Sequence, residues 1–247
     1  MSRSWKMLSP LVARQAELTS AMQEIADPQG GGGLPQVFTN APGPQYLGTY
    51  TPYEASRDFP DEVRALISAA AGEEVHRSLL LEKSRTVNED AEAYAAKERW
   101  AAGIQRMADF LKENRRRDSK LQALAVGMLL SDLQDELSAA AVRASLSLEV
   151  FRRLTVEDLL LVFDGKPFLS VLLRLFERRL RNPNDPWKPN DLNDMQFLGL
   201  AAAYADCVVG ERHFLRLLAD IRPKAHVRAK LYTNLAECMA ELPLAAG

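Results

Sequence analysis

The apolar positions of this chain recur at helical spacing over most of its length. In residues 11–26 the large apolar side chains fall on one helical face, at Leu11, Leu18, Met22 and Ile25. Asp27-Pro28 and the four glycines that follow, at 30–33, end this predicted helix. Residues 34–60 are rich in Pro, Gly, Tyr and Thr and show no sustained period, which predicts an extended loop.

The middle of the chain, residues 61–154, is predicted to be helical almost throughout. One helix expected there carries its apolar side chains at Trp100, Ile104, Met107, Phe110 and Leu111. The helical spacing resumes at residue 120 and continues to residue 145. This pattern is typical of a helical insertion and differs from that of a nucleotide-binding fold.

Beyond residue 155 the pattern changes to helices combined with a strand. Thr155-Val156-Glu157-Asp158 has the sequence of a capped helix start, and an apolar helix is predicted over 168–180. Pro and Asn residues break the chain at 182–186 before a second apolar helix. The β-branched run Cys207-Val208-Val209 then predicts a short buried strand.

Four acidic residues flank the second helix and this strand. Asp191 and Asp194 open the helix on one face, where like charges repel by roughly 0.2–0.5 kcal/mol unless a cation compensates them. Asp206 precedes the strand and Glu211 follows it. Ligands gather beyond the carboxyl ends of parallel strands, so Glu211 and the helix-start acids are expected to converge. Oxygen ligands of this kind suit Mg²⁺.

Each of these acids also has a purely local explanation. Asp191 and Asp194 suit the positive end of a helix dipole, where Asp191 can cap free N–H groups. Asp206 fits a turn, and Glu211 fits the first turn of the next helix. The pattern alone leaves both explanations open.

These residues resemble the C-terminal half of PIN-like domains, a family of metal-dependent ribonucleases. Asp194 matches the acid that starts a helix in that family, Val208-Val209 the strand, and Glu211 the acid after the strand. His213-Phe214 matches the aromatic ending that commonly follows. The resemblance therefore implies that Asp194 and Glu211 are metal ligands.

The resemblance extends over roughly the last third of the chain. Asp191 and Asp206 match extra acids of a bacterial subgroup with Asn-Asp-x-x-Asp and Tyr-x-Asp signatures. Residues 225–227 resemble the closing strand of the domain and residues 234–237 its closing helix. The implied fold is mainly α with a small α/β part, in which a PIN-like three-layer core with a short parallel sheet occupies residues 155–247.

The start of the chain departs from the family pattern. PIN-like domains begin with a strand that ends in a metal-binding Asp, whereas residues 1–8 here lead into Ser9-Pro10. Residues 7–12 resemble the second strand-to-helix entry, which makes Glu17 the candidate for the Glu that usually follows. We therefore expect either a chain that begins inside a longer reading frame or a site that has lost catalysis. Residues 1–60 are assigned to an N-terminal helix and a Gly/Pro-rich loop.

Composition and charge limit the kinds of binding partner that the sequence supports. The 247 residues carry a net charge of −2, so affinity for RNA would need a local basic patch. Arg178, Arg179 and Arg181 stand just before the acids and could hold an RNA backbone, or they could be ordinary cations at a helix end. Only two cysteines occur, and no stretch has the length of a membrane span, which predicts reduced thiols and a cytoplasmic protein without a membrane partner.

Two hypotheses follow from these patterns. In the first, the protein is a PIN-like endoribonuclease, truncated or inactive if the N-terminal ligand is lost. Asp191, Asp194 and Glu211, with Asp206, would bind Mg²⁺ or Mn²⁺ in such an enzyme. In the second, it is a non-catalytic helical protein derived from such a core, whose helical region binds a protein partner or forms a homo-oligomer.

Overall fold

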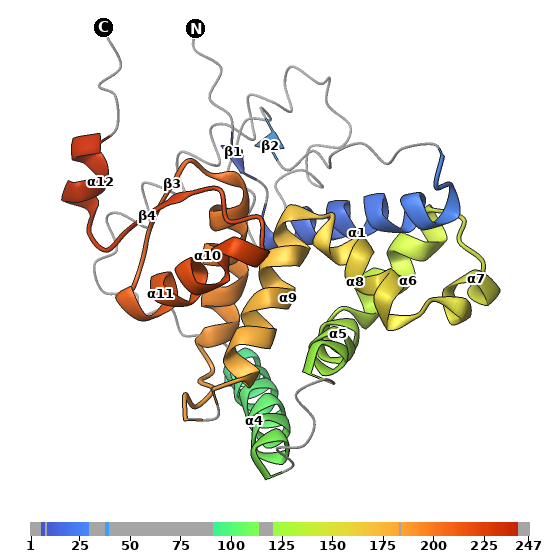
Figure 1. The fold of residues 1–247 in the computed structure, drawn as a ribbon, viewed down its shortest axis with the longest axis horizontal. Coiled ribbons are helices and arrows are strands. Elements are labelled where there is room, and N and C mark those ends of the chain that lie inside the picture. The colour runs from blue at the N-terminus through green and yellow to red at the C-terminus, as the bar shows by residue number, and fades with distance from the viewer. Residues whose placement is uncertain are drawn as a thin grey trace, which may run out of the picture.

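The structure, a computed structural model, describes residues 6–7, 9–29, 38–39, 91–113, 121–182 and 184–241 (Figure 1). Its first elements are β1 (Lys6–Met7), α1 (Pro10–Ala26), β2 (Phe38–Thr39), α4 (Ala91–Glu113), α5 (Leu121–Asp132), α6 (Gln134–Arg143), α7 (Leu148–Arg153) and α8 (Val156–Asp164). The chain continues with α9 (Pro167–Leu180), α10 (Asp191–Tyr204), β3 (Cys207–Val209), α11 (Arg212–Ile221), the 3₁₀ turn η2 (Arg222–Lys224), β4 (Lys230–Tyr232) and α12 (Leu235–Glu241). The expectation of a mainly helical chain is confirmed for these residues.

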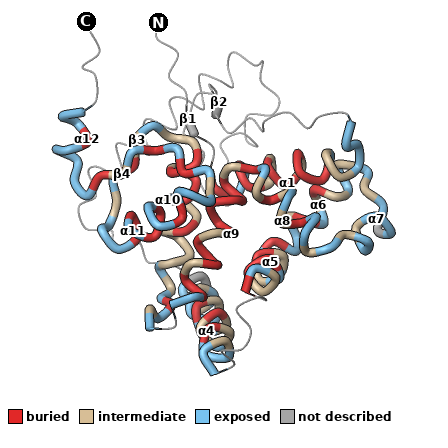
Figure 2. The backbone as a smooth tube through the Cα atoms, viewed as in Figure 1, coloured by how far each residue is buried: buried red, intermediate tan, exposed pale blue. Residues whose placement is uncertain are grey.

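Helix α9 lies at the centre of this arrangement. It packs against α1, α4, α5, α8, α10 and α11 and is buried along most of its length (Figure 2). Pro167 occupies the first helical turn, where its fixed φ angle suits a helix and its missing N–H costs no hydrogen bond. Leu and Phe side chains then cover most of the circumference of α9, which explains why neighbours surround it on many sides.

Several local expectations are confirmed. The predicted first helix is α1, with Ser9 as its N-cap, and it ends before Asp27. Thr155 and Asp158 form a capping box at the start of α8, in which each side chain accepts from the other's backbone N–H. Of the predicted loop over residues 34–60, the structure describes only Phe38–Thr39, which form β2 instead of a loop. The rest of that loop and the helices predicted over 61–90 lie outside the described residues.

A short parallel sheet is present in the C-terminal third, as expected. Strands β3 and β4 pair in parallel, with Val208 opposite Leu231. The closing strand is nevertheless Lys230–Tyr232, so its prediction at residues 225–227 is wrong. The backbone N–H groups of Arg228 and Ala229 donate to the carbonyl of Ala202 at the end of α10, at 2.9 and 3.1 Å. Because these two N–H groups bond to α10, the backbone cannot pair with β3 before residue 230.

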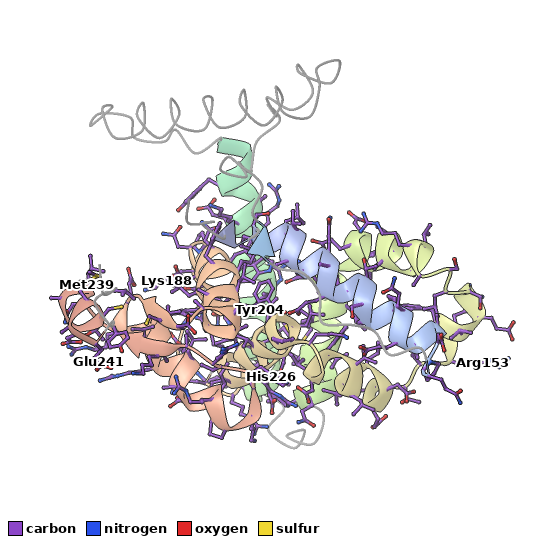
Figure 3. All side chains as sticks on the ribbon, turned by 90° about the horizontal axis from the view of Figure 1, so that it is seen from above. Arg153, Lys188, Tyr204, His226, Met239 and Glu241 are labelled. Atoms are coloured by element: carbon purple, nitrogen blue, oxygen red, sulfur yellow. The ribbon has the colours of Figure 1, made fainter. Side chains whose placement is uncertain are left out.

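Helix α12 stands at one end of the molecule and packs on β3 and β4, as Figures 1 and 3 show. The hydroxyl of Tyr232 donates to Glu241 at 2.7 Å, and this bond raises the pKa of Tyr232 to about 12. Cys207 of β3 and Cys238 of α12 are both free thiols. The helix predicted around residues 234–237 is thus confirmed, starting at Leu235.

The carboxylate of Glu17, on α1, is fully buried and holds the first turn of α9. It accepts the backbone N–H groups of Phe168 and Leu169, both at 2.8 Å, and the hydroxyl of Tyr204 at the end of α10. Figure 3 shows Tyr204 near the middle of the molecule. The N-cap residue Lys166 makes no side-chain cap bond, so Glu17 replaces a local cap with one from another helix.

Charge around Glu17 is compensated locally. Burial raises the pKa of the Glu17 carboxyl above its ordinary value, although the Tyr204 hydroxyl, the two backbone N–H groups and Lys166 all act to lower it. The buried ammonium of Lys166 donates to Ser20 at 3.0 Å and to Glu24. Burial, followed by the charge of Glu17, raises the pKa of Tyr204, which keeps its hydroxyl a hydrogen-bond donor.

We predict that Glu17→Ala lowers the free energy of unfolding by about 3 kcal/mol or more, because it leaves two backbone N–H groups and one hydroxyl buried without their acceptor. Urea denaturation followed by circular dichroism measures the change. Glu149→Ala, which removes an exposed partner of Arg153 on α7, is the matched control and should change stability by no more than about 0.5 kcal/mol. Equal effects of the two substitutions would contradict this role of Glu17.

Candidate functional site

Arg179, near the end of α9, organises the segment that leads to α10. Its side chain is 1% exposed, and its Nη1 lies 2.7 Å from Oδ2 of Asp191. Its Nη2 donates to the carbonyl of Pro186 at 3.1 Å, and its Nε lies 3.7 Å from Asp185. A buried guanidinium requires such partners, so Arg179 fixes the start of α10 against the end of α9.

Aromatic side chains cover this guanidinium. The centre of the Arg179 guanidinium lies 4.0 Å from the ring centroid of Trp187. Trp187 in turn stacks on Phe176 of α9, with ring centroids 5.9 Å apart, and meets the edge of Trp100 of α4 at 5.6 Å. Cation–π and edge-to-face contacts of this kind each contribute about 0.5–1.5 kcal/mol, so the cluster holds the 182–190 segment in place.

Three of the predicted site acids act on one another. Burial raises the pKa of Asp194 above its ordinary value, and the negative charges of Glu211 and Asp191 raise it further. His213 has the opposite effect on Asp194, and its Nε2 lies 3.3 Å from Asp185. Asp194 therefore lies within electrostatic reach of Asp191 and Glu211, and these three carboxylates are called the acidic cluster below.

Close packing between β3 and α10 brings Glu211 to this cluster. A Cβ atom on Gly210 would lie only 3.3 Å from Leu198, one turn beyond Asp194 on α10. The backbone of Gly210 also donates to the carbonyl of Tyr232 in β4, at 3.1 Å. Glu211 occupies the N-cap position of α11, but its side chain makes no cap bond there. Its carboxylate therefore accepts no capping hydrogen bond, although its negative charge suits the positive end of the α11 dipole.

Asp206 stands apart from the other three acids. It lies at the amino end of β3, whereas Glu211 follows the carboxyl end. Its backbone carbonyl accepts the N–H of Lys230 at 2.8 Å, which starts the pairing of the two strands. Helix α10 has 14 residues and is therefore about 20 Å long, with Asp191 at one end and Asp206 beyond the other.

Glu17, the candidate for the family's second acid, also lies away from the cluster. Its bond to Tyr204 places it at the C-terminal end of α10, opposite Asp191. The carboxylate is occupied there by three donors. The structure thus uses Glu17 to join helices, and it brings together only the acids from the second half of the resemblance.

The three arginines before the acids have partners within the protein. Arg178 binds Asp220 at 2.7 Å, and Arg181 binds Glu177 at 2.8 Å. Because Arg179 is buried, the expectation that it contacts an RNA backbone is wrong. The sequence does contain a signal for the burial of Arg179, because this residue follows Leu172 and Phe176 at helical spacing and so shares their buried face. The contacts of Arg179 with Trp187 and Asp185 were not predicted from the sequence.

The acidic cluster suits a divalent cation by its chemistry. All three groups are carboxylates, and both contacts of Asp191, with Arg179 and with the N–H of Lys188, use the same oxygen, Oδ2. Among the described residues, however, no three His, Cys, Asp or Glu side chains are placed so that they could hold a metal ion as they stand. Binding would therefore require these side chains to turn toward the ion.

Comparisons of the chain with known protein families, curated proteins and solved structures find no match. Within the described ranges, no helix is both long enough and apolar enough to cross a membrane.

We predict that, without divalent ions, Asp194→Asn stabilises the protein by about 0.5 kcal/mol at pH 7 and by less at pH 4. The pKa of Asp194 is raised on folding, so its contribution to stability is present below its ordinary pKa of 3.8 and is lost as the pH rises through the folded value. Asparagine removes this loss together with the repulsion from Glu211 and Asp191.

Thermal unfolding in EDTA at several pH values measures this effect. Glu98→Gln removes an exposed charge from the middle of α4 and serves as the control, with little expected change at any pH. If Asp194→Asn destabilised the protein at pH 7, the carboxylate would have a favourable partner, and mutual repulsion among the three acids would be ruled out.

Proposed function

We propose that the protein is a PIN-like, divalent-metal-dependent endoribonuclease. The observation that carries this proposal is the convergence of Asp194 with Asp191 and Glu211, acids from two separate segments whose charges repel. Carboxylates whose pKa is raised by burial and by neighbouring negative charges occur often at functional sites. On this proposal, α10, β3, α11, β4 and α12 belong to a PIN-like three-layer core.

Each group in the cluster would have a distinct task. Asp194 and Glu211 would hold Mg²⁺ or Mn²⁺, with Asp191 contributing the oxygen that Arg179 does not use. The bound ion supplies the chemistry of phosphodiester hydrolysis, namely an activated water and compensation of phosphate charge. Arg179 fixes the position of Asp191, and the Trp187 ring excludes water from that ion pair.

Cations beside the acids support RNA as the substrate. Lys188 and Arg212 are both exposed, and each is a near neighbour in sequence of an acid of the cluster, Asp191 and Glu211 respectively. Exposed cations of this kind can bind phosphate groups, which the overall charge of −2 would otherwise repel. These two residues replace the arginines of α9 as the proposed backbone contacts, and we propose a cytoplasmic location for the activity.

One observation favours a second candidate function. The Arg179 guanidinium already balances the charge of Asp191, so part of the cluster is stable without a metal ion. A PIN-like core that has lost catalysis would keep this pair and use its helical region to bind a protein partner or a second copy. The two candidates differ in whether a divalent ion stabilises the folded chain.

We predict that Mn²⁺ raises the melting temperature of the wild type and has no such effect on Asp194→Asn. An ion present at about 100 times its Kd stabilises a folded protein by about 2.7 kcal/mol, provided that it does not bind the unfolded chain. Glu98→Gln should keep the full shift, which separates loss of the site from a change in net charge.

Cleavage of single-stranded RNA is then measured with and without Mn²⁺. The endoribonuclease proposal expects metal-dependent cleavage that Asp194→Asn abolishes. If Mn²⁺ stabilised neither protein and no RNA were cut, the non-catalytic candidate would take its place.

A further inference from the structure

A cavity of about 150 Å³ lies between α1, α4, α5, α9 and α10. Its apolar wall consists of leucines from α5, α9 and α10 and from the junction of α5 and α6, together with Phe176 and Met195. Its polar groups come from Arg14, Trp100, Asp132 and Gln196. Asp132 is exposed and Gln196 half-buried, so these two residues mark its mouth. The cavity is separate from the acidic cluster but shares α10 with it.

Two charged groups of opposite sign determine which ligands the cavity accepts. Arg14 is 9% exposed and pairs with Glu136 through Nη2, while its buried Nε has no hydrogen-bond partner among the described residues. Asp132 accepts the indole N–H of Trp100 at 2.9 Å through Oδ2. A cation and a carboxylate on one wall favour an uncharged ligand that offers both an acceptor and a donor, because a ligand with a net charge would meet one group of like sign.

The size and the aromatic walls favour a planar ring. A protein cavity of about 150 Å³ holds one benzene molecule, which sets the scale at a single six-membered ring. Trp100 and Phe176, which also contact Trp187, are the aromatic residues of the lining, and bases stack on side chains of this kind. A pyrimidine base combines this size with adjacent carbonyl acceptors and N–H donors, whereas a purine is larger by a second ring.

The cavity lies beside the proposed cleavage site. Met195 lines the cavity and stands four residues after Asp191 on α10, so the two Cβ atoms are about 5–6 Å apart. A base in the cavity would leave its sugar and phosphate at the mouth beside Gln196, on the same helix that carries Asp191 and Asp194. Single-stranded RNA is recognised in this way, by bases that leave the stack and bind on their Watson–Crick edges.

We propose that this cavity binds one pyrimidine base of a single-stranded RNA substrate, with Arg14 Nε donating to a base carbonyl and Asp132 accepting from the base. The proposal rests on the proposed ribonuclease function for its substrate, but the binding itself needs neither a metal ion nor the acidic cluster.

Isothermal titration of uridine, cytidine and adenosine into the Asp194→Asn protein in EDTA tests the cavity without metal and without cleavage. We expect uridine or cytidine to bind at least about tenfold more tightly than adenosine. Asp132→Asn in this background should weaken pyrimidine binding about tenfold, because its one remaining carbonyl oxygen is taken by Trp100. Asp135→Asn, an exposed acid on α6 outside the cavity, is the matched control and should leave binding unchanged.

A second substitution keeps the test decisive if Asp132→Asn disturbs Trp100. Gln196→Trp should close the mouth and abolish pyrimidine binding, while circular dichroism confirms the fold. Absence of saturable pyrimidine binding, equal binding of adenosine, or equal effects of Asp132→Asn and Asp135→Asn would each overturn the base site.

Short oligouridylate and oligoadenylate distinguish an RNA base from a free nucleoside. In the Asp194→Asn background, oligouridylate should bind more tightly than both uridine and oligoadenylate. If oligouridylate bound no better than uridine, the ligand would be a free nucleoside and the RNA proposal would be wrong. If pyrimidines bound but Mn²⁺ neither stabilised the protein nor supported cleavage, the base site would be retained and the ribonuclease proposal would be wrong. If RNA were cleaved without pyrimidine binding, the ribonuclease proposal would be retained and the base site would be wrong.

Discussion

The buried carboxylate of Glu17 joins the three helices on which the rest of the structure depends. Helix α9 runs through the core, so the free N–H groups of its first turn cannot be satisfied by water. Glu17 of α1 accepts two of them and also the hydroxyl of Tyr204, which ends α10. A negative charge at this end also suits the helix dipole. The position of α9, and with it that of α10, thus follows from one side chain contributed by α1.

The opposite end of α9 is held by a charge of opposite sign. Arg179 lies in the last turn, where a cation suits the negative end of the dipole, and it binds Asp191 at the first turn of α10. Its burial beneath Trp187 makes the pair rigid and ties α4 to the same place through Trp100. The acidic cluster and the neighbouring cavity are therefore both built on α10 between two fixed ends.

The candidate site contains one acid that is paired with a cation and two acids that repel each other. Asp191 is balanced by Arg179, whereas the pKa of Asp194 is raised by burial and by the charges of Glu211 and Asp191, and of its charged neighbours only His213 lowers it. At Gly210 the backbone passes so close to α10 that a Cβ atom there would lie 3.3 Å from Leu198, and the adjacent Glu211 is near α10 in spite of this repulsion. The packing of β3 against α10 thus offsets the repulsion between these carboxylates.

Local patterns in the sequence by themselves determined most of the helices, the capping box at Thr155, the strand at Cys207 and the acids at Asp191, Asp194 and Glu211, because spacing, caps and β-branched runs are properties of neighbouring residues. Only the tertiary structure decided what distant groups do to one another. In the tertiary structure Glu17 caps the first turn of α9, and Arg179 is buried beneath Trp187. The closing strand begins only at Lys230, because the backbone N–H groups of the two preceding residues donate to the carbonyl of Ala202. Asp206 also lies at the far end of α10 from Asp191. These outcomes depend on contacts between segments up to 187 residues apart, as between Glu17 and Tyr204, and periodicity along the chain carries no information about such pairs.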